Sequence, residues 1–308
     1  MTKCLVTKLN GIVNNNSILK MGEMRIKVNK ISSPTSTSQN IKIGFTNNVN
    51  ISIIGNGFFT DETLTNNMGT QKTVSSREKL YLSNGDYEIS ISDKYSIEYL
   101  ETFTSSETNK TLNIEDLKFS NSCTSIWLQN STSVSGDISA LSNLTALTSL
   151  FIGSTSVSGD ISALSNLTAL TSLNLGSTSV SGDISALSNL TALKGSVLLQ
   201  KLTLTGDLAK IPSNVKWFTN YKGVSSTFTW TTRPSSANIL ALECGDSTID
   251  DVDKMLQNQA QCKTAITGGD ASWYKTIAIK GNRTSASDSA VSTLKSNGYT
   301  VIINGVIL

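Results

Sequence analysis

The sequence predicts a mainly β protein in which an N-terminal β-sandwich precedes a solenoid of short stacked repeats. Three observations indicate this. A 23-residue unit recurs almost unchanged, residues 1–112 contain short alternating apolar runs instead, and Ser, Thr and Asn make up more than a third of the chain. We expect an N-terminal arm over 1–22, the sandwich over 23–112, and the solenoid over 113–308 with an α/β C-terminal cap from about 238 to 308.

The front part contains short apolar-alternating runs separated by polar turns, as strands of a sandwich do. The expected strands are Met24–Val28, Ile41–Phe45, Val49–Ile54, Lys79–Leu82 and Tyr87–Ile91. Asn84-Gly85 between the last two is typical of a hairpin turn. These runs lack a common period, so they predict a domain separate from the solenoid.

The middle of the chain is an internal repeat. Ser135–Val157 and Ser158–Val180 differ at only two positions, and Ser181–Leu193 begins the same unit again. Gly-Asp pairs begin at 136, 159, 182 and 206, with spacings of 23, 23 and 24 residues. A fixed period in this range indicates a solenoid, in which each unit buries its apolar face only against its neighbours.

Apolar positions within the unit specify the kind of solenoid. Leu170, Leu173 and Leu175, followed by Val180-x-Gly182-x-Ile184, have the spacing of a leucine-rich repeat, with one short strand per turn. Leu187, Leu190 and Leu193 are expected to point inward from the convex side. The unit resembles the 23–24-residue leucine-rich-repeat class that carries L-x-G-x-I after the strand. It has Thr132, Thr155 and Thr178 where that class usually has Asn, and the hydroxyl is expected to replace the amide's contact with the neighbouring turn.

The array is expected to continue on both sides of the identical units. Asn113–Leu117 is an expected first turn, and Ile126–Leu128 fits the strand of an earlier turn. Val197–Leu199 and Leu204–Gly206 keep the register of the repeat. The later strand candidates are Val215–Phe218, Ile239–Leu242, Ile277–Ile279 and Val301–Ile303. Capping residues and a Gly stop signal predict helices at Asp250–Gln259 and Ala286–Ser296. These larger units read as a cap that closes the solenoid.

Composition excludes several classes of function. Without histidine there is no Ser-His-Asp triad, no Cys-His pair and no His-ligated metal site. A net charge of +2 argues against nucleic-acid binding, and no apolar run reaches the ~18–20 residues of a membrane span. The first residues lack the apolar core of a secretory signal. We therefore expect no enzyme, no cofactor, no metal, no nucleic-acid partner and no membrane insertion.

The cysteines are widely spaced, which argues against a zinc site. Cys4, Cys123, Cys244 and Cys262 are expected to be thiols packed as small hydrophobic groups. Cys244 and Cys262 flank one expected helix, so a disulfide between them is left open.

The concave strand face is the candidate binding surface, because side chains flanking the buried strand residues point to solvent there. The candidate ligand-binding residues are Trp127, Gln129, Phe151, Asn174, Leu198 and Gln200. Two aromatic residues on neighbouring turns suit sugar stacking or a protein partner. The alternative is a solvated neutral surface with two incidental aromatics.

Asp137, Asp160 and Asp183 form a second column and are the only charged residues between Phe119 and Leu193. A calcium ladder would use such carboxylates, but one per turn supplies few ligands for each ion. We expect each Asp to cap its own turn by accepting backbone N–H bonds.

Both ends of the chain resemble virion proteins of phages that infect gut Bacteroidales, including crAss-like phages. The similar stretches run from Lys3 to Val28 and from Lys275 to Gly305. The resemblance implies a head or tail fibre or a capsid decoration, made in the host cytoplasm and located in the virion. The N-terminal region would attach to other virion proteins, with Cys4, Leu5, Val6 and Leu9 as candidate attachment residues. It also implies a homo-oligomer.

Three hypotheses follow for the whole chain. The first is a phage virion protein whose repeats adhere to a host surface protein or glycan. The second is a bacterial leucine-rich-repeat cell-surface adhesin. The third is a purely structural capsid decoration whose repeats have no ligand. Binding to host cells separates the first from the third.

Overall fold

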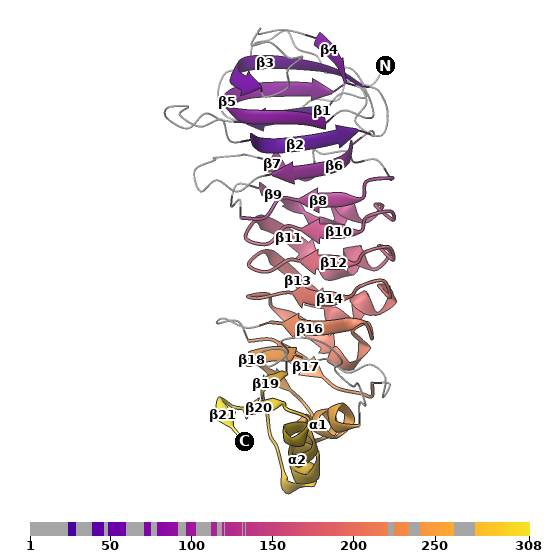
Figure 1. Cartoon of the computed structure of the whole chain (residues 1–308), viewed down its shortest axis with the longest axis vertical. Coiled ribbons are helices and arrows are strands. Elements are labelled where there is room, and N and C mark those ends of the chain that lie inside the picture. Colours follow the sequence, from indigo (N-terminus) through magenta and orange to yellow (C-terminus); the bar gives the residue numbers. More distant parts are fainter. Residues whose placement is uncertain are drawn as a thin grey trace.

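The protein is an elongated stack of strands that lie across its long axis, as the computed structural model shows (Figure 1). The structure describes the backbone of strands at 24–28, 39–45, 49–59, 71–74, 79–91 and 97–102, and residues 112–115, 119, 121–130, 132, 134–220, 225–233, 241–261 and 275–308. The expected arm over 1–22, with Cys4, Leu5, Val6 and Leu9, lies outside the described residues, as does Cys262.

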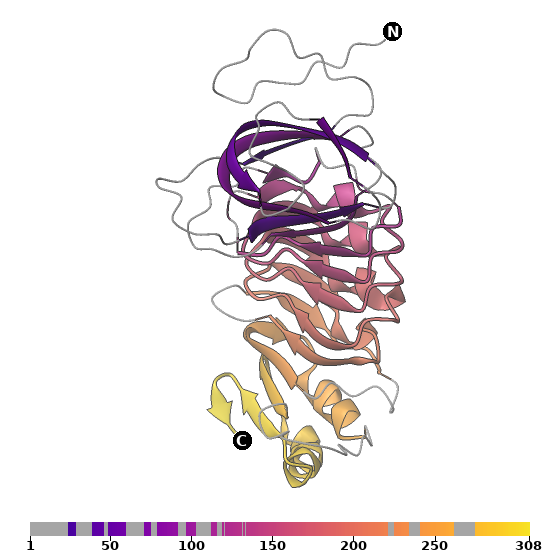
Figure 2. The ribbon, with the colours of Figure 1, turned by 45° about the horizontal axis from the view of Figure 1, so that its top comes forward.

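Antiparallel strands make up the described part of the front region, at the end of the stack opposite helices α1 and α2 (Figure 2). They are β1 (Met24–Val28), β2 (Gln39–Phe45), β3 (Val49–Phe59), β4 (Gln71–Val74), β5 (Lys79–Ile91) and β6 (Ile97–Thr102). β5 pairs with β1, β2 and β3, while β2 also pairs with β6 and β3 with β4. β6 then pairs in parallel with β8, so the sheet continues into the repeats. The sandwich and the domain boundary at 112 stay predictions.

The hairpin turn expected at Asn84-Gly85 is wrong, because β5 runs through both residues as one strand. Its partner β3 pairs on either side of them, from Gly57 opposite Gly85 to Phe59 opposite Leu82. The register shifts between these pairs, so two β5 residues, Ser83 and Asn84, lie opposite one β3 residue, Phe58. Asn-Gly is thus accommodated as a β-bulge, which suits glycine as a turn does.

The repeats form two ladders of parallel strands. The first contains β8 (Ser125–Trp127), β10 (Ser149–Phe151), β12 (Ser172–Asn174), β14 (Gly195–Leu198) and β16 (Val215–Thr219). The second contains β7 (Leu112–Asn113), β9 (Val134–Asp137), β11 (Ser156–Asp160), β13 (Ser179–Asp183), β15 (Leu204–Asp207) and β17 (Thr227–Thr229). The expectation of one strand per turn is therefore wrong. The second-ladder strands β9, β11, β13 and β15 each contain Gly-Asp and mostly small or polar residues. Their strand character therefore comes from stacking on neighbouring turns and not from their own propensity.

The interior of the solenoid is one continuous apolar core. In the second complete unit every inward residue is at most 1% exposed, namely Ile161, Leu164, Leu167, Leu170, Leu173, Leu175 and Val180. Leu187, Leu190 and Leu193 of the next unit are buried too, as expected for residues pointing inward from the convex side. Full burial of each such side chain contributes about 1.5–3 kcal/mol. The leucine-rich-repeat solenoid is thus confirmed.

Short 3₁₀ helices follow the second strands and complete each turn. They are η1 (Ile138–Leu141), η2 (Ile161–Leu164), η3 (Ile184–Asn189) and η4 (Leu208–Lys210). An Asp side chain caps every one: Oδ1 of Asp137, Asp160 and Asp183 accepts the N–H bond two residues further on, at 2.7–2.8 Å, and Asp207 does the same at 2.9 Å. The capping role expected for the Asp column is confirmed.

The threonines at the usual Asn position bond within their own turn. The Thr155 hydroxyl donates to the Ile152 carbonyl at 2.7 Å, and the Thr178 hydroxyl donates to the Leu175 carbonyl at 2.8 Å. The expected contact with the neighbouring turn is therefore wrong for these two, because each hydroxyl already donates to a carbonyl of its own turn. Other threonines link turns instead: the Thr171 hydroxyl donates to the Thr148 carbonyl at 2.9 Å.

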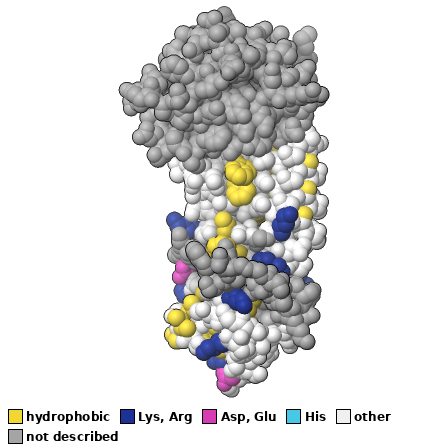
Figure 3. All heavy atoms as spheres, viewed as in Figure 1, with side chains coloured by type: hydrophobic (Ala, Val, Ile, Leu, Met, Phe, Trp, Pro, Cys, Tyr) yellow, Lys and Arg dark blue, Asp and Glu magenta, His cyan; other side chains and the backbone are white. Residues whose placement is uncertain are grey.

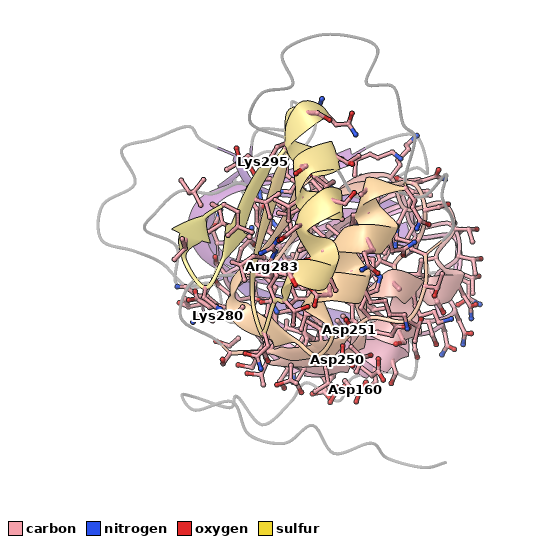
Figure 4. All side chains as sticks on the ribbon, turned by 90° about the horizontal axis from the view of Figure 1, so that it is seen from below. Asp160, Asp250, Asp251, Lys280, Arg283 and Lys295 are labelled. Atoms are coloured by element: carbon pink, nitrogen blue, oxygen red, sulfur yellow. The ribbon has the colours of Figure 1, made fainter. Side chains whose placement is uncertain are left out.

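Larger α/β units close the C-terminal end. They comprise β18 (Ala241–Ile249), α1 (Val252–Ala260), β19 (Thr276–Lys280), the 3₁₀ turn η5 (Ser285–Ser287), α2 (Asp288–Ser296), β20 (Thr300–Ile303) and β21 (Val306–Ile307). β18 pairs with both ladders, β19 and β20 extend the first, and β21 folds back antiparallel on β20. Seen from below, α1 and α2 lie side by side (Figure 4). Both expected helices and the cap are confirmed.

The described cysteines are apolar core residues. Cys123 and Cys244 are buried thiols, and burial raises the pKa of the Cys244 thiol far above its ordinary value. The Cys244 thiol carries no disulfide in the structure, and Cys262 lies outside the described residues. Among the described helices, none combines the length and hydropathy that crossing a bilayer requires.

Candidate functional site

The exposed side of strands β8, β10, β12 and β14 forms the candidate site, which we call the strand face. The middle residues of these strands, such as Leu150 and Leu173, are buried, so the residues on either side point outward. The described strand face consists of Ser125, Trp127, Gln129, Ser149, Phe151, Ser172, Asn174, Ser196, Leu198 and Gln200. All six predicted ligand-binding residues therefore lie on one continuous surface.

An aromatic pair stands at the upper end of the strand face. Trp127 pairs in register with Phe151, and their ring centroids lie 4.8 Å apart with planes tilted by 52°. Trp127 is 37% exposed, and the other exposed large hydrophobic residues of the described chain, Val306 and Ile307, lie at the C-terminal end. Figure 3 shows a compact hydrophobic patch on this face directly beneath the grey region. The pair forms a tilted aromatic platform open to solvent.

Amide side chains continue the face below the aromatic pair. Asn174 Nδ2 donates to Gln129 Oε1 at 3.4 Å, and Asn174 Oδ1 accepts the Gly176 N–H bond at 3.1 Å. The Gln200 side chain makes no hydrogen bond to another described residue. Its Oε1 lies over Gly176, so close that a Cβ on that residue would be only 2.3 Å from the oxygen. Gln200 thus keeps its donor and acceptor available to a ligand.

Two glycines create the space in which these amides lie. A Cβ on Gly153 would lie 2.6 Å from Asn174 Oδ1. A Cβ on Gly176 would likewise collide with the Gln200 side chain. Sequence reasoning did not identify Gly153 and Gly176 as part of the site. Both glycines follow the strand at the same position of successive units, and this regularity is visible in the sequence. That Asn174 and Gln200 lie over them can be seen only in the structure.

The open face ends at the fifth rung of the described ladder. Thr219 continues the column of Phe151, Asn174 and Leu198, and it is 0% exposed. Trp217 continues the column of serines and is partly buried. The accessible part of the strand face therefore runs from β8 to β14, which is three strand spacings or ~14 Å.

Charge is absent from most of this surface. The only charged residues between Phe119 and Leu193 are Asp137, Asp160 and Asp183, which end the second-ladder strands. Asp160 points outward from the edge of the molecule (Figure 4). The Ser139 N–H bond, followed by the Ser139 hydroxyl, lowers the pKa of Asp137, and the corresponding Ser162 groups lower that of Asp160.

The acidic column is used for capping. Each carboxylate bonds its own turn, and within the described residues no group of three or more Cys, Asp or Glu side chains is placed to hold a metal ion. The described residues therefore offer no set of ligands for the calcium ladder that the sequence analysis considered.

The two near-identical units differ where the strand face is. Ser135–Val157 and Ser158–Val180 differ at Phe151 against Asn174 and at Ile152 against Leu175. The first difference is on the exposed column and replaces an aromatic ring by an amide. The second is a conservative change between two buried residues that are 0% exposed. The array therefore keeps its scaffold and varies its exposed strand surface.

No protein-family model matches the chain, and no curated protein matches it. Solved structures do match it in part. One is the leucine-rich-repeat ectodomain of the plant membrane receptor kinase GASSHO1/SCHENGEN3 from Arabidopsis thaliana, at 26% identity over 48% of this chain and 18% of that chain, with a TM-score of 0.37. That structure is a complex with CASPARIAN STRIP INTEGRITY FACTOR 2.

Two bacterial structures match as well. Internalin C2 from Listeria monocytogenes is 19% identical over 54% of this chain and 68% of that chain, with a TM-score of 0.39. A leucine-rich-repeat protein from Leptospira interrogans is 14% identical over 61% of this chain and 44% of that chain, with a TM-score of 0.42. The overlaps are partial, and the fold of this chain is established by its own repeat and ladders.

Proposed function

We propose that the chain is a non-enzymatic adhesion protein of a phage virion, in which the N-terminal region attaches to other virion proteins and the strand face binds the host surface. The observation that carries the proposal is the aromatic pair of Trp127 and Phe151 on the strand face, in which Trp127 is exposed and Phe151 is half-buried. Contiguous exposed aromatics favour recognition, because their apolar surface is buried only when a partner covers it.

The arrangement of the repeat supports a surface that binds. The scaffold positions of the two near-identical units are the same, while the exposed position changes from Phe151 to Asn174. A spacer without a ligand needs only the scaffold, and the buried residues of the scaffold are the same whether Phe151 or Asn174 stands at that point, apart from the change from Ile152 to Leu175. In an adhesion protein, the change from Phe151 to Asn174 would alter which groups of a host protein or glycan the surface can contact.

The virion origin is supported by the resemblance of both chain ends to virion proteins of Bacteroidales phages. Under the proposal the protein is made in the host cytoplasm, assembles as a homo-oligomer, and displays its repeats on a head or tail fibre or decoration. A low density of charge on the repeats suits such a display, because it limits unspecific electrostatic attachment.

Mass spectrometry of purified phage particles tests the location. We expect peptides from the front region and from the repeats in particles that have been freed of cell debris. Absence of the chain from particles would remove the virion proposal and leave the bacterial surface adhesin as the alternative.

Binding to Bacteroidales cells tests adhesion. The full chain is expected to bind, and a Trp127→Ala, Phe151→Ala variant with an unchanged circular-dichroism spectrum is expected to lose binding. If neither protein binds any host strain, adhesion is excluded and the structural decoration remains.

A further inference from the structure

We infer that the ligand of the strand face is an uncharged glycan. This inference rests on the proposed adhesion function and names its ligand class. It follows from three properties of the described surface: its lack of charge, its exposed aromatic platform, and its row of amide and hydroxyl groups.

The lack of charge argues against anionic ligands. From β8 to β12 the strand face carries no lysine or arginine, and the first lysines on its C-terminal side, Lys194 and Lys201, flank β14. On its other side the register places Glu101 of β6 next to Trp127. β14 lies three strand spacings from Trp127, ~14 Å away. That distance exceeds the Debye length of ~8 Å at physiological ionic strength. A sulfate, phosphate or carboxylate held at the aromatic pair would therefore find no cation to pair with on the strand face between β8 and β12.

The aromatic pair suits the apolar face of a sugar ring. A pyranose ring presents C–H groups on one face, and these carry a small positive charge that matches the negative face of an indole. Phe151 lies 4.8 Å from Trp127 and tilted against it, so it supports the indole and limits its rotation. The ring is thereby presented to the ligand in one orientation.

The polar groups next to the pair suit the hydroxyl groups of the same ligand. Gln129 Oε1 is held by Asn174, which orients the Gln129 amide and directs its Nε2 group for donation. Gln200 contributes a donor and an acceptor with no described protein partner. An amide both donates and accepts, as a sugar hydroxyl does. A few placed polar groups beside an apolar surface are the usual basis of specificity in ligand sites.

The size of the surface favours a glycan over a folded protein. Each side of a specific protein–protein interface contributes about 20–30 residues. The described strand face offers ten side chains from β8 to the buried Thr219. One of its three columns carries only serine. A narrow chain lying along the columns matches this strip.

A glycan array tests the inference. The full chain, applied to neutral and anionic glycans, is expected to bind neutral structures. Raising the salt concentration to 0.5 M, where exposed charge pairs are screened, is expected to change the apparent affinity less than about twofold. Selective binding to sulfated, sialylated or phosphorylated glycans, with loss at high salt, would overturn the inference.

Variants assign the binding to the strand face. Trp127→Ala is expected to weaken neutral-glycan binding at least about tenfold, and Gln200→Ala to weaken it less. The control Lys194→Gln, Lys201→Gln is expected to bind neutral glycans like wild type. A second control, Ser158→Ala with Ser181→Ala on the second ladder, is expected to bind unchanged. Equal binding by Trp127→Ala would contradict the inference, provided that its circular-dichroism spectrum is unchanged.

Treated host cells separate this inference from the proposed function. Periodate, which cleaves sugar diols, is expected to abolish binding to Bacteroidales cells, while proteinase K treatment is expected to preserve it. If proteinase K abolishes binding and periodate does not, the ligand is a protein: adhesion stands and the glycan inference fails. If untreated cells are not bound at all, both fail.

Discussion

Each turn of the array is joined to the next by an Asp and a Gly from consecutive units. Asp137 caps η1, and its carboxylate lies against Gly159, where a Cβ would be 2.7 Å from Oδ1. Asp160 lies in the same way against Gly182, at 2.8 Å. These glycines also have positive φ values of +108° and +116°. Glycine is thus required twice at each position, for its backbone conformation and for the carboxylate that lies over it.

Replacing one of these glycines tests that requirement. Gly182→Ala is expected to lower the free energy of unfolding by about 1–3 kcal/mol, because a side chain is strained at positive φ and meets Asp160. Urea unfolding followed by circular dichroism measures the change. Gly245→Ala is the matched control, since a Cβ there would meet nothing within 4 Å. Equal effects of the two substitutions would contradict the account.

The capping carboxylates predict a loss of stability in acid. Bonds from Ser139 and Ser162 lower the pKa of Asp137 and Asp160 below the ordinary 3.8. A lowered folded-state pKa means that these carboxylates stabilise the fold above pH 3.8 and lose this contribution as the pH falls through the folded-state pKa values. Both are solvent-accessible, so the effect of each is small.

An Asn substitution separates the cap from its charge. Asn also accepts an N–H bond at a helix start, so Asp137→Asn, Asp160→Asn is expected to keep most of the wild-type stability at pH 7. Between pH 7 and pH 3 the variant is expected to lose less stability than wild type, as measured by urea midpoints. Identical pH dependence of the two proteins would show that these carboxylates do not contribute.

At the scale of elements, a buried arginine joins the repeats to the cap. Arg233 is 2% exposed, and its guanidinium donates to the carbonyls of Ala209, Ile211 and Pro212, at 3.3, 2.6 and 3.0 Å. Its N–H donates to Asn258 Oδ1 on α1 at 2.7 Å, and Asn258 Nδ2 donates to its carbonyl at 3.0 Å. Arg233 thus provides hydrogen-bond donors for the backbone carbonyls at the end of η4, and its two bonds with Asn258 fix the position of α1.

Loss of this side chain is expected to be costly. Arg233→Met leaves buried carbonyls without donors, and we expect it to reduce the free energy of unfolding by roughly 3 kcal/mol or more. Arg283→Met removes an ion pair to Asp288, whose side chain is 63% exposed, and is expected to cost less than ~1 kcal/mol. Thermal unfolding of both variants provides the comparison. A smaller cost for Arg233→Met than for Arg283→Met would contradict the role of Arg233.

The near identity of two units predicts that one can be removed. Deletion of residues 158–180 places Asp137 against Gly182 as it now lies against Gly159, and it sets β10 beside β14. Because repeat stability is a sum over units and their interfaces, the shortened chain is expected to fold cooperatively with a lower Tm and a smaller urea m-value. Non-cooperative unfolding would show that the units are not equivalent.

Across the whole molecule, the repeat made most of the fold predictable. Its period gave the strands at Ile126–Leu128 and Val197–Leu199, the inward leucines and the exposed columns, because each unit repeats the environment of the one before it. Both C-terminal helices followed from capping residues and a Gly stop. The strand-face residues followed from alternation about the buried leucines.

What was not predictable depends on contacts distant in sequence. The second ladder arises from stacking of polar segments that have little strand character of their own. The bulge at Asn84 and Gly85 depends on the length of β3. The burial of Thr219 and the position of Arg233 depend on packing outside the periodic units. No local pattern encodes such contacts.

The central claim is that adjacent aromatics on the strand face recognise the host, and exchanging two residues tests it directly. Phe151→Asn with Asn174→Phe keeps the composition and the scaffold, since each unit already accepts the other's residue, but it separates the ring from Trp127. Binding of the full chain to Bacteroidales cells is the measurement. An aromatic pair contributes about 0.5–1.5 kcal/mol beyond its buried area, so binding is expected to fall up to about tenfold. Wild-type binding by the exchanged protein would contradict the claim.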